Sequence, residues 1–164
     1  MNKTTQNATV GVKEGASRVR GGGMGDGRGR TFVAVYGTLM RGERNERWRD
    51  GVATVSEGVM QGLLYDTGWG FPNFVPQAEC AGVRCEVLET DDEGIAHMDV
   101  LEGYPHLYVR APVRVKCDDG ETREALVYTM LDERRSPDER RIMPNAAEIA
   151  DWREYRKGNL RLRR

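Results

Sequence analysis

A short apolar run followed at once by a glycine turn constrains this chain most. Phe32–Val35 holds two valines and an aromatic residue without a charge, which predicts a strand buried on both faces. The strand runs into Tyr36-Gly37-Thr38-Leu39, where the glycine permits a sharp turn. The amides of Gly37, Thr38 and Leu39 can then converge, and clustered backbone N–H groups form a cradle for an anion or an oxyanion. The alternative is a strand that ends in an ordinary turn.

The composition predicts one folded domain behind an unusual lead. The 164 residues suffice for one domain with a core, so we assign residues 31–164 to it. Residues 1–30 hold eight glycines, six Lys or Arg and two acids, but no Phe, Trp or Tyr, which predicts a disordered Gly/Arg-rich tail. The alternative for this tail is an arm that contacts RNA or another partner. The net charge of −1 leaves the domain itself acidic, which disfavours nucleic acid as its partner.

Several classes of protein are disfavoured. No apolar run approaches the ~20 residues that span a bilayer, and the N-terminus lacks the apolar segment of a secretory signal. Three cysteines without a Cys-x-x-Cys pair indicate reduced thiols and a cytoplasmic protein. With only His97 and His106, and no metal-ligand spacing, we expect no metal and no cofactor. The sequence leaves the oligomeric state open.

Alternating apolar residues predict strands in the middle of the chain. They are expected at residues 52–65, 83–88, 108–117 and 123–130, with a hairpin turn at Asp118-Asp119-Gly120. The segment 83–88 has the alternation of a half-buried strand. With the first strand and the predicted helices, this pattern indicates an α+β domain of six or seven strands and two or three helices.

Two segments between the predicted strands carry candidate ligand contacts. Arg41–Asp50 is expected to form a charged surface loop or short helix, either a solvated face or a source of arginines for a substrate carboxylate. The candidates are Arg41, Arg44 and Arg47. Thr67–Asn73 is predicted to be a loop by its glycines and proline. Its aromatic residues, Trp69 and Phe71, either wall a pocket or cap the core.

Two helices are predicted from capping residues and periodicity. Thr90 with Glu93 has the pattern of a capping box, and Gly103 with Pro105 marks the end of that helix. Ile95, Met98 and Leu101 are expected on its buried face. A second helix is predicted to begin near Asn145 and to end at Gly158. Ile149, Trp152 and Tyr155 are expected on the buried face of this second helix.

The predicted end of the first helix gives one carboxyl an unusual environment. Glu102 falls on the last turn, where the helix dipole disfavours an anion by roughly 0.3–1 kcal/mol. Its neighbours Leu101, Tyr104 and Pro105 offer little solvation, so both effects raise its pKa. A carboxyl that titrates nearer neutral pH suits proton transfer. The alternative is a surface glutamate that tolerates the dipole.

Four segments, in this order, resemble the γ-glutamylcyclotransferase-like family, which includes γ-glutamylamine cyclotransferases and AIG2-like proteins. They are Tyr36-Gly37-Thr38-Leu39, Gly62-Leu63-Leu64-Tyr65-Asp66, Leu101-Glu102-Gly103-Tyr104-Pro105 with Tyr108, and Ala125-Leu126-Val127-Tyr128. The resemblance covers residues 31–130, with a weaker echo in the last helix. It implies a compact, mixed, barrel-like β-sheet with two or three flanking helices.

The resemblance also implies an activity. The γ-glutamyl group of a γ-glutamyl amine or peptide would be cyclised to 5-oxoproline, with release of the free amine. Glu102 matches the family's catalytic glutamate and would act as general acid and base. The implied substrate contacts are Tyr36, Gly37, Thr38, Leu39, Tyr65 and Tyr108. The α-amine of the substrate is itself the nucleophile, so the protein need supply none.

Three other functions fit parts of the sequence. The same fold could serve as a non-catalytic module that binds an amino acid or another small molecule. The Gly/Arg-rich tail could make the chain RNA-associated. Cys80 or Cys85 could be the nucleophile of a hydrolase or amidotransferase, although no partner base is placed near either. The sequence does not indicate which γ-glutamyl amine would be the substrate.

Overall fold

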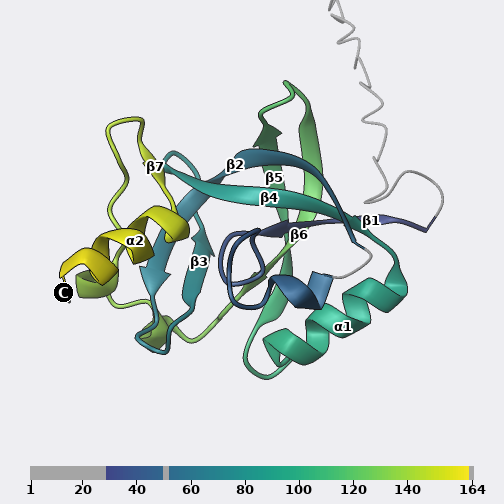
Figure 1. Cartoon of the computed structure of the whole chain (residues 1–164), viewed down its shortest axis with the longest axis horizontal. Helices are drawn as coiled ribbons and strands as arrows, with labels where there is room; N and C mark the ends of the chain where they lie inside the picture. The colour runs from purple at the N-terminus through teal and green to yellow at the C-terminus, as the bar shows by residue number, and fades with distance from the viewer. Residues whose placement is uncertain (1–28, 50–51, 163–164) are drawn as a thin grey trace, which may run out of the picture.

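The computed structural model describes residues 29–49 and 52–162, so the predicted tail lies outside it apart from Gly29 and Arg30 (Figure 1). The described part of the chain contains seven strands and two α-helices, which confirms the α+β class. In chain order these are β1 Thr31–Val35, β2 Ala53–Asp66, β3 Pro72–Pro76, β4 Gly82–Thr90, α1 Asp92–Glu102, β5 Val109–Cys117, β6 Thr122–Thr129, β7 Ile149–Ala150 and α2 Trp152–Leu162. Three short 3-10 helices are η1 Glu46–Arg49, η2 Glu133–Arg135 and η3 Asp138–Arg140. Neither α-helix is long and apolar enough to cross a membrane.

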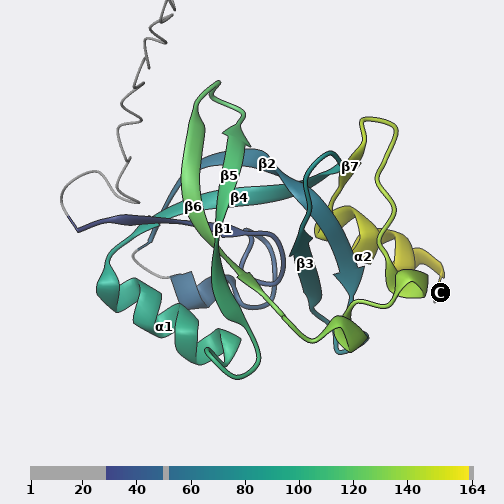
Figure 2. The ribbon, with the colours of Figure 1, turned by 180° about the vertical axis from the view of Figure 1, so that it is seen from behind.

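Five of the strands close into a barrel (Figures 1 and 2). The order is β2-β5-β6-β1-β4, and β4 pairs back onto β2. All these pairs are antiparallel except β1 with β6. The long β2 bends at an irregularity between Thr54 and Ser56, as a bulge permits. The barrel-like sheet implied by the resemblance is therefore present, with β3 and β7 added outside the closed ring.

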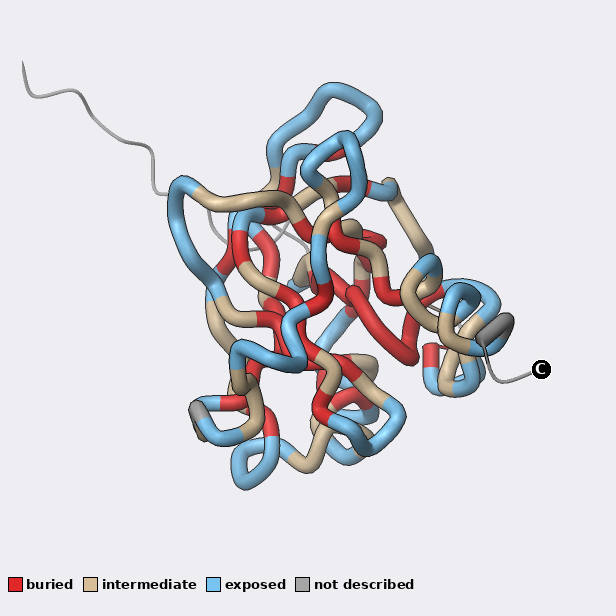
Figure 3. The backbone as a smooth tube through the Cα atoms, turned by 90° about the vertical axis from the view of Figure 1, so that its left-hand side faces the viewer, coloured by how far each residue is buried: buried red, intermediate tan, exposed pale blue. Residues whose placement is uncertain are grey.

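The buried residues gather inside the barrel, as the tube coloured by burial shows (Figure 3). The central strand β1 contributes Val33, Ala34 and Val35, all buried as its apolar run predicts. The neighbouring β4 is more buried than its alternation suggests, because Glu86 is only 1% exposed on the face opposite Cys85 and Val87. Side chains from outside the barrel cover that face.

The cover over Glu86 is an ion-pair cluster that the sequence did not indicate. The Arg49 guanidinium contacts its carboxylate, and Arg153 lies 3.3 Å from the same group. The backbone amide of Arg41 donates to it at 3.0 Å. Arg49 is itself buried, so the prediction that Arg41–Asp50 is a charged surface segment is wrong at this residue. A buried carboxylate requires partners of this kind.

The predicted start of α1 is one residue early, whereas its end is confirmed. Asp91 is the N-cap, and its side chain accepts a hydrogen bond from the Gly94 amide at 3.0 Å. Thr90 instead belongs to β4 and is buried. Glu102 is the last residue of α1, and Gly103 follows in the left-handed conformation with φ of 63°. The helix therefore delivers Glu102 at its C-terminus, as predicted.

The second helix begins later and extends further than its periodicity suggests. The Asn145 side chain accepts hydrogen bonds from the amides of Ala147 and Ile149, which forms a turn rather than a helical start. Residues 149–150 then pair with β4 as β7, and α2 begins only at Trp152. The helix continues through Gly158.

Candidate active site

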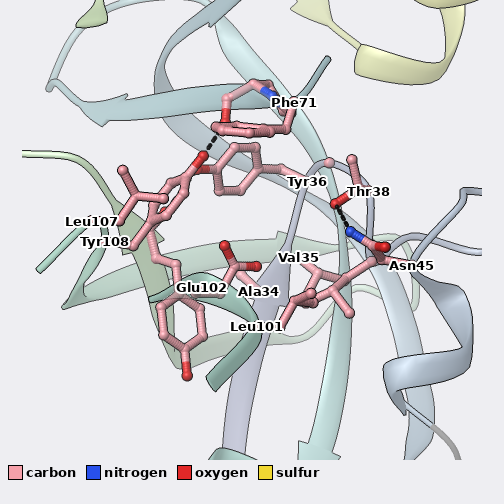
Figure 4. Close-up of a pocket in the computed structure, with 14 residues that line it drawn as sticks. Ala34, Val35, Tyr36, Thr38, Asn45, Phe71, Leu101, Glu102, Leu107 and Tyr108 are labelled. Carbon is pink, nitrogen blue, oxygen red and sulfur yellow. Dashed lines mark hydrogen bonds between the residues drawn. The ribbon is translucent and has the colours of Figure 1, made fainter. Parts of the chain in front are cut away.

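One pocket brings the end of α1 and the glycine turn together (Figure 4). Its walls come from β1 and the following turn, the loop before β3, the end of α1, and the start and end of the β5–β6 hairpin. The lining residues are Ala34, Val35, Tyr36, Gly37, Thr38, Leu39, Asn45, Phe71, Pro72, Leu101, Glu102, Leu107, Tyr108 and Tyr128. All the predicted site residues except Tyr65 are in this set.

Tyr36 fixes the start of the turn to the barrel. Its hydroxyl donates to the carbonyl of Tyr128 at 2.7 Å and accepts from the amide of Phe74 at 3.1 Å. Burial is the main cause that raises the pKa of this phenol. Both hydrogen-bonding capacities are thus used by the backbone of neighbouring strands, so Tyr36 anchors the turn and presents its ring to the pocket.

In the turn after Tyr36, the backbone carbonyls accept hydrogen bonds from the protein, whereas the backbone amides donate none within the described residues. The carbonyl oxygens of Gly37, Thr38 and Leu39 accept hydrogen bonds from the Met40 amide, the Asn45 amide and the Arg49 guanidinium, at 3.0, 3.0 and 3.1 Å. Among the loop hydrogen bonds of the described residues, these three residues contribute no amide donor. The side chain of Asn45 also donates to the Thr38 hydroxyl at 3.0 Å. Hydrogen bonds to its carbonyl and hydroxyl oxygens therefore fix the turn in place.

Glu102 lies across the pocket from this turn. Figure 4 shows its carboxylate directed into the pocket, beside Tyr108 and Ala34. Within the described residues it has no hydrogen-bond or ion-pair partner, and it is partly exposed because it faces the pocket. Burial raises its pKa from 4.5 to about 7, since an apolar surrounding disfavours the charged form. The direction of the shift is the predicted one, and of the two predicted causes burial is the one found here, not the helix dipole.

Tyr108 and Phe71 form the wall beside Glu102. The Tyr108 hydroxyl donates to the carbonyl of Pro72 at 2.6 Å. Burial, followed by the nearby charge of Glu102, raises the pKa of this phenol well above its ordinary value. The rings of Phe71 and Tyr108 lie 6.3 Å apart. Of the two aromatic residues considered for a pocket wall, Phe71 lines the pocket, whereas Trp69 lies outside it and is 48% exposed.

Tyr65 is not brought to the pocket. It lies on β2 opposite Asn73, forms an isolated bridge with Arg141, and has Asp138 near its hydroxyl. Successive side chains of a strand point to opposite faces, so Tyr65 faces away from the side that Leu64 occupies. None of the residues Gly62–Asp66 lines the pocket, so the resemblance carried by this segment did not indicate where Tyr65 lies.

The charged segment after the turn supplies a different pocket residue from those expected. Arg41, Arg44 and Arg47 are exposed and none lines the pocket. Asn45, between two of them, lines it and holds Thr38. Sequence reasoning missed Asn45 because the charges dominate that segment. The one feature that could have indicated Asn45 is that it is a neutral amide within a run of charged residues.

Gly37 is required by a close contact rather than by its backbone angles, since it is not among the glycines with positive φ. A Cβ at this position would lie 2.7 Å from Cγ and 2.9 Å from Cδ of Pro72. We therefore expect Gly37→Ala to displace the turn and to lower ligand affinity by about tenfold, on the order of 1.4 kcal/mol. Isothermal calorimetry would measure it, with 5-oxoproline, the product that the sequence resemblance implies, as the ligand.

The matched control is Gly158→Ala. This glycine lies within α2, and a Cβ added to it would meet nothing within 4 Å. That variant should keep the affinity and gain roughly 0.5–1 kcal/mol of helix stability. Equal affinities of the Gly37 variant and the natural chain would show that the turn does not position the ligand.

A closed barrel whose pocket holds one carboxyl of raised pKa has the features of a small-molecule site. The chain belongs to the family described as "Gamma-glutamyl cyclotransferase, AIG2-like", whose family model matches residues 33–154. This match confirms the resemblance seen in the four sequence segments.

Individual relatives agree with this membership. A Drosophila melanogaster protein named "Putative gamma-glutamylcyclotransferase" is 30% identical over 105 residues, which cover 58% of this chain and 67% of the relative. The structure of YkqA from Bacillus subtilis is similar with a TM-score of 0.61 and 25% identity, over 79% of this chain but only 42% of that protein. An AIG2-like protein from Mus musculus shares the fold with a TM-score of 0.57 and 22% identity, over 67% of this chain and 81% of that one.

Proposed function

We propose that the chain cyclises the γ-glutamyl group of a γ-glutamyl amine or peptide to 5-oxoproline and releases the free amine. The observation that carries this proposal is the Glu102 carboxyl, which faces the turn of residues 36–39 in one pocket and has a pKa raised to about 7. Family membership supports the same class of reaction.

In the proposed reaction the substrate supplies the nucleophile. Its α-amine attacks the γ-carbonyl carbon, a C–N bond closes a five-membered lactam, and the bond to the leaving amine breaks. Holding the two ends of one molecule in contact replaces a bimolecular encounter, which can contribute several kcal/mol, up to about 7–11. The barrel and the rings of Tyr36 and Tyr108 would provide that confinement.

Glu102 would carry the proton. As a carboxylate it takes one proton from the α-ammonium group, and as an acid it gives that proton to the departing amine. The attacking nitrogen loses a second proton once its C–N bond has formed, and Glu102 would pass this proton on in the same way, so that the amine leaves as an ammonium ion. Proton transfer by a placed group typically contributes ~10²–10⁴-fold, and is most effective when its pKa is near the working pH. A pKa of about 7 lets Glu102 occupy both states at neutral pH.

The turn would stabilise the charge that develops on the γ-carbonyl oxygen. The carbonyls of Gly37, Thr38 and Leu39 accept hydrogen bonds from protein donors, which fixes the turn. Their amides donate to no group among the described residues and would be left for a ligand. Preorganised amides of this kind stabilise an oxyanion without having to reorganise. Asn45 would keep Thr38 in place through its two hydrogen bonds.

The test of this function is release of 5-oxoproline from a panel of γ-glutamyl amines and peptides incubated with the full chain. We expect stoichiometric 5-oxoproline and free amine from at least one member. Binding without turnover across the panel would overturn the catalytic proposal and favour a non-catalytic binding module.

The pH dependence follows from the state of Glu102. The reaction begins with the carboxylate as a base, so kcat/KM should fall about tenfold per pH unit below the pKa of about 7 and level off above it. Initial rates between pH 5 and 8.5, at subsaturating substrate, would measure this limb. A profile that is flat across that range, or that falls as pH rises, would contradict the assigned role.

The thiol-based alternative finds no support in the site. Neither Cys80 nor Cys85 lines the pocket. Burial raises the pKa of Cys85 far above its usual range, so this thiol stays protonated and is a poor nucleophile at neutral pH. The three cysteines are free, and the cytoplasmic location inferred from them stays a prediction.

A further inference from the structure

The wall of the pocket beyond Tyr108 is apolar and extends to the protein surface. Phe71 and Leu107 line the pocket, and Leu107 is 39% exposed. Trp69 continues this surface, with its ring 5.9 Å from that of Phe71. We call Trp69, Phe71 and Leu107 the apolar rim. In Figure 4, Leu107 lies on the other side of Glu102 from Thr38.

The polar groups of the pocket lie elsewhere. Among the described residues, the amides of residues 37–39 donate no hydrogen bond, and Asn45 lies beside this turn. The hydroxyls of Tyr36 and Tyr108 donate to backbone carbonyls. No Lys, Arg, His or Asp is among the described residues that line the pocket, and Glu102 is its one carboxyl. A charged group placed against Phe71 inside the pocket would therefore find no partner of opposite charge among the lining residues to replace the water it loses.

Arg44, Arg135 and Arg140 lie around the loop that carries Trp69 and Phe71, with Arg140 beside Gly68, and none of them lines the pocket. The Arg135 guanidinium stacks on Trp69, 3.8 Å from the ring centroid, and lies 3.7 Å from the carboxylate of Asp132. Arg44 packs beside Gly70 in the same loop, outside the pocket lining. Stacking and pairing leave Arg135 better suited to hold the Trp69 ring than to receive an anion.

From this distribution we propose that the γ-glutamyl ligand of the pocket carries an uncharged, apolar amine substituent, which packs on the apolar rim. This proposal rests on the proposed function, and it names the class of the amine released. With the reacting atoms between Glu102 and the turn, the substituent on the γ-nitrogen would extend along Phe71 and Leu107. Amino acids and peptides would bring a carboxylate to that surface and should be poorer ligands.

Three matched compounds test the proposal. They are the γ-glutamyl derivatives of phenethylamine, ethylamine and phenylalanine, which separate the effect of the ring from that of the carboxylate. We expect kcat/KM for the phenethylamine compound to exceed each of the others by at least about tenfold, the discrimination that an apolar contact provides. Calorimetric affinities of the three compounds for the same full chain give a second readout without turnover.

Variants show whether the apolar rim is responsible. Phe71→Ala and Leu107→Ala should each lower the phenethylamine-to-ethylamine ratio several-fold, to about tenfold. Met143→Ala is the control, because that side chain is exposed outside the pocket and should leave the ratio unchanged. A phenylalanine derivative that is an equal or better ligand, or ratios insensitive to both rim variants, would overturn the proposal.

The two proposals fail in different ways. Turnover of all three compounds at similar kcat/KM would remove the inference about the apolar rim and keep the cyclising function. Selective binding of the phenethylamine compound without any 5-oxoproline would keep the apolar rim and remove catalysis.

Discussion

Glu102→Gln is expected to lower 5-oxoproline release by at least about 10²-fold, and by as much as 10⁴-fold, while the barrel stays folded. The amide has the size and shape of the carboxyl but cannot take the proton from the α-ammonium group. Ligand affinity should change far less than kcat, because the turn of residues 36–39 is untouched. The measurement is kcat and KM for the best substrate of the panel.

A matched control for this variant is Glu93→Gln, an exposed glutamate in the first turn of the same helix and outside the pocket. It removes one negative charge from α1 and should retain turnover. If Glu102→Gln kept kcat within threefold of the natural chain, another group would have to carry the proton.

The same variant should be more stable than the natural chain at alkaline pH. Below about pH 4.5, Glu102 is protonated both in the folded and in the unfolded chain, so the two proteins should have similar free energies of unfolding. Between the unfolded value and about 7, the folded chain alone retains the proton. The natural chain therefore loses stability as pH rises across this window. Above about 7 the folded chain too holds an ionised carboxyl in its apolar pocket, and the loss levels off.

One pKa unit corresponds to ~1.4 kcal/mol. Glu102→Gln should therefore raise the free energy of unfolding at pH 8 by on the order of 2–3 kcal/mol. The lower figure is favoured because the carboxyl is partly exposed and solvent screens its charge. Urea unfolding of both proteins at pH 4.5 and 8 measures the difference. A gain that was absent at pH 8, or equal at both pH values, would contradict a raised pKa.

The second large effect is expected at the buried ion pair behind the turn. Glu86→Gln leaves Arg49 buried without its carboxylate, and loss of one partner of such a pair costs about 3–5 kcal/mol of unfolding free energy. Arg49 also donates to the Leu39 carbonyl at 3.1 Å. The variant should therefore loosen the turn as well, and raise KM in the surviving folded protein.

The matched control is Glu124→Gln, which breaks the exposed pair with Arg114. Exposed ion pairs contribute about 0–1 kcal/mol, so this variant should remain close to the natural chain in urea unfolding. A Glu86→Gln variant as stable as the Glu124 control would show that the buried pair does not hold the barrel and the turn together.

The features that could be predicted from the sequence are those with a local cause. The apolar run of β1, the hairpin between β5 and β6, and the glycine that ends α1 are all fixed by neighbouring residues. The position of Glu102 followed from that helix end, and the upward direction of its pKa shift followed from its apolar neighbours. The closed barrel was predicted only from the family resemblance, because no local sequence pattern indicates which strands pair.

The features that were missed depend on contacts between distant segments. The pairing of Arg49 with Glu86 crosses 37 positions of the chain, so a charged residue in a polar segment gave no sign of burial. Tyr65 was expected at the site from the family resemblance, but its whole segment, Gly62–Asp66, lies outside the pocket lining, which depends on where β2 runs in the barrel. The Gly37 contact with Pro72 likewise needed the loop before β3 in place.

The most direct test of the central claim is an experimental structure of the full chain with 5-oxoproline bound. The account predicts the lactam ring in the pocket, with its carbonyl oxygen within hydrogen-bond distance of amides of residues 37–39 and its ring nitrogen beside the Glu102 carboxyl. A lactam bound elsewhere on the barrel, or one whose nitrogen faces away from Glu102, would contradict it.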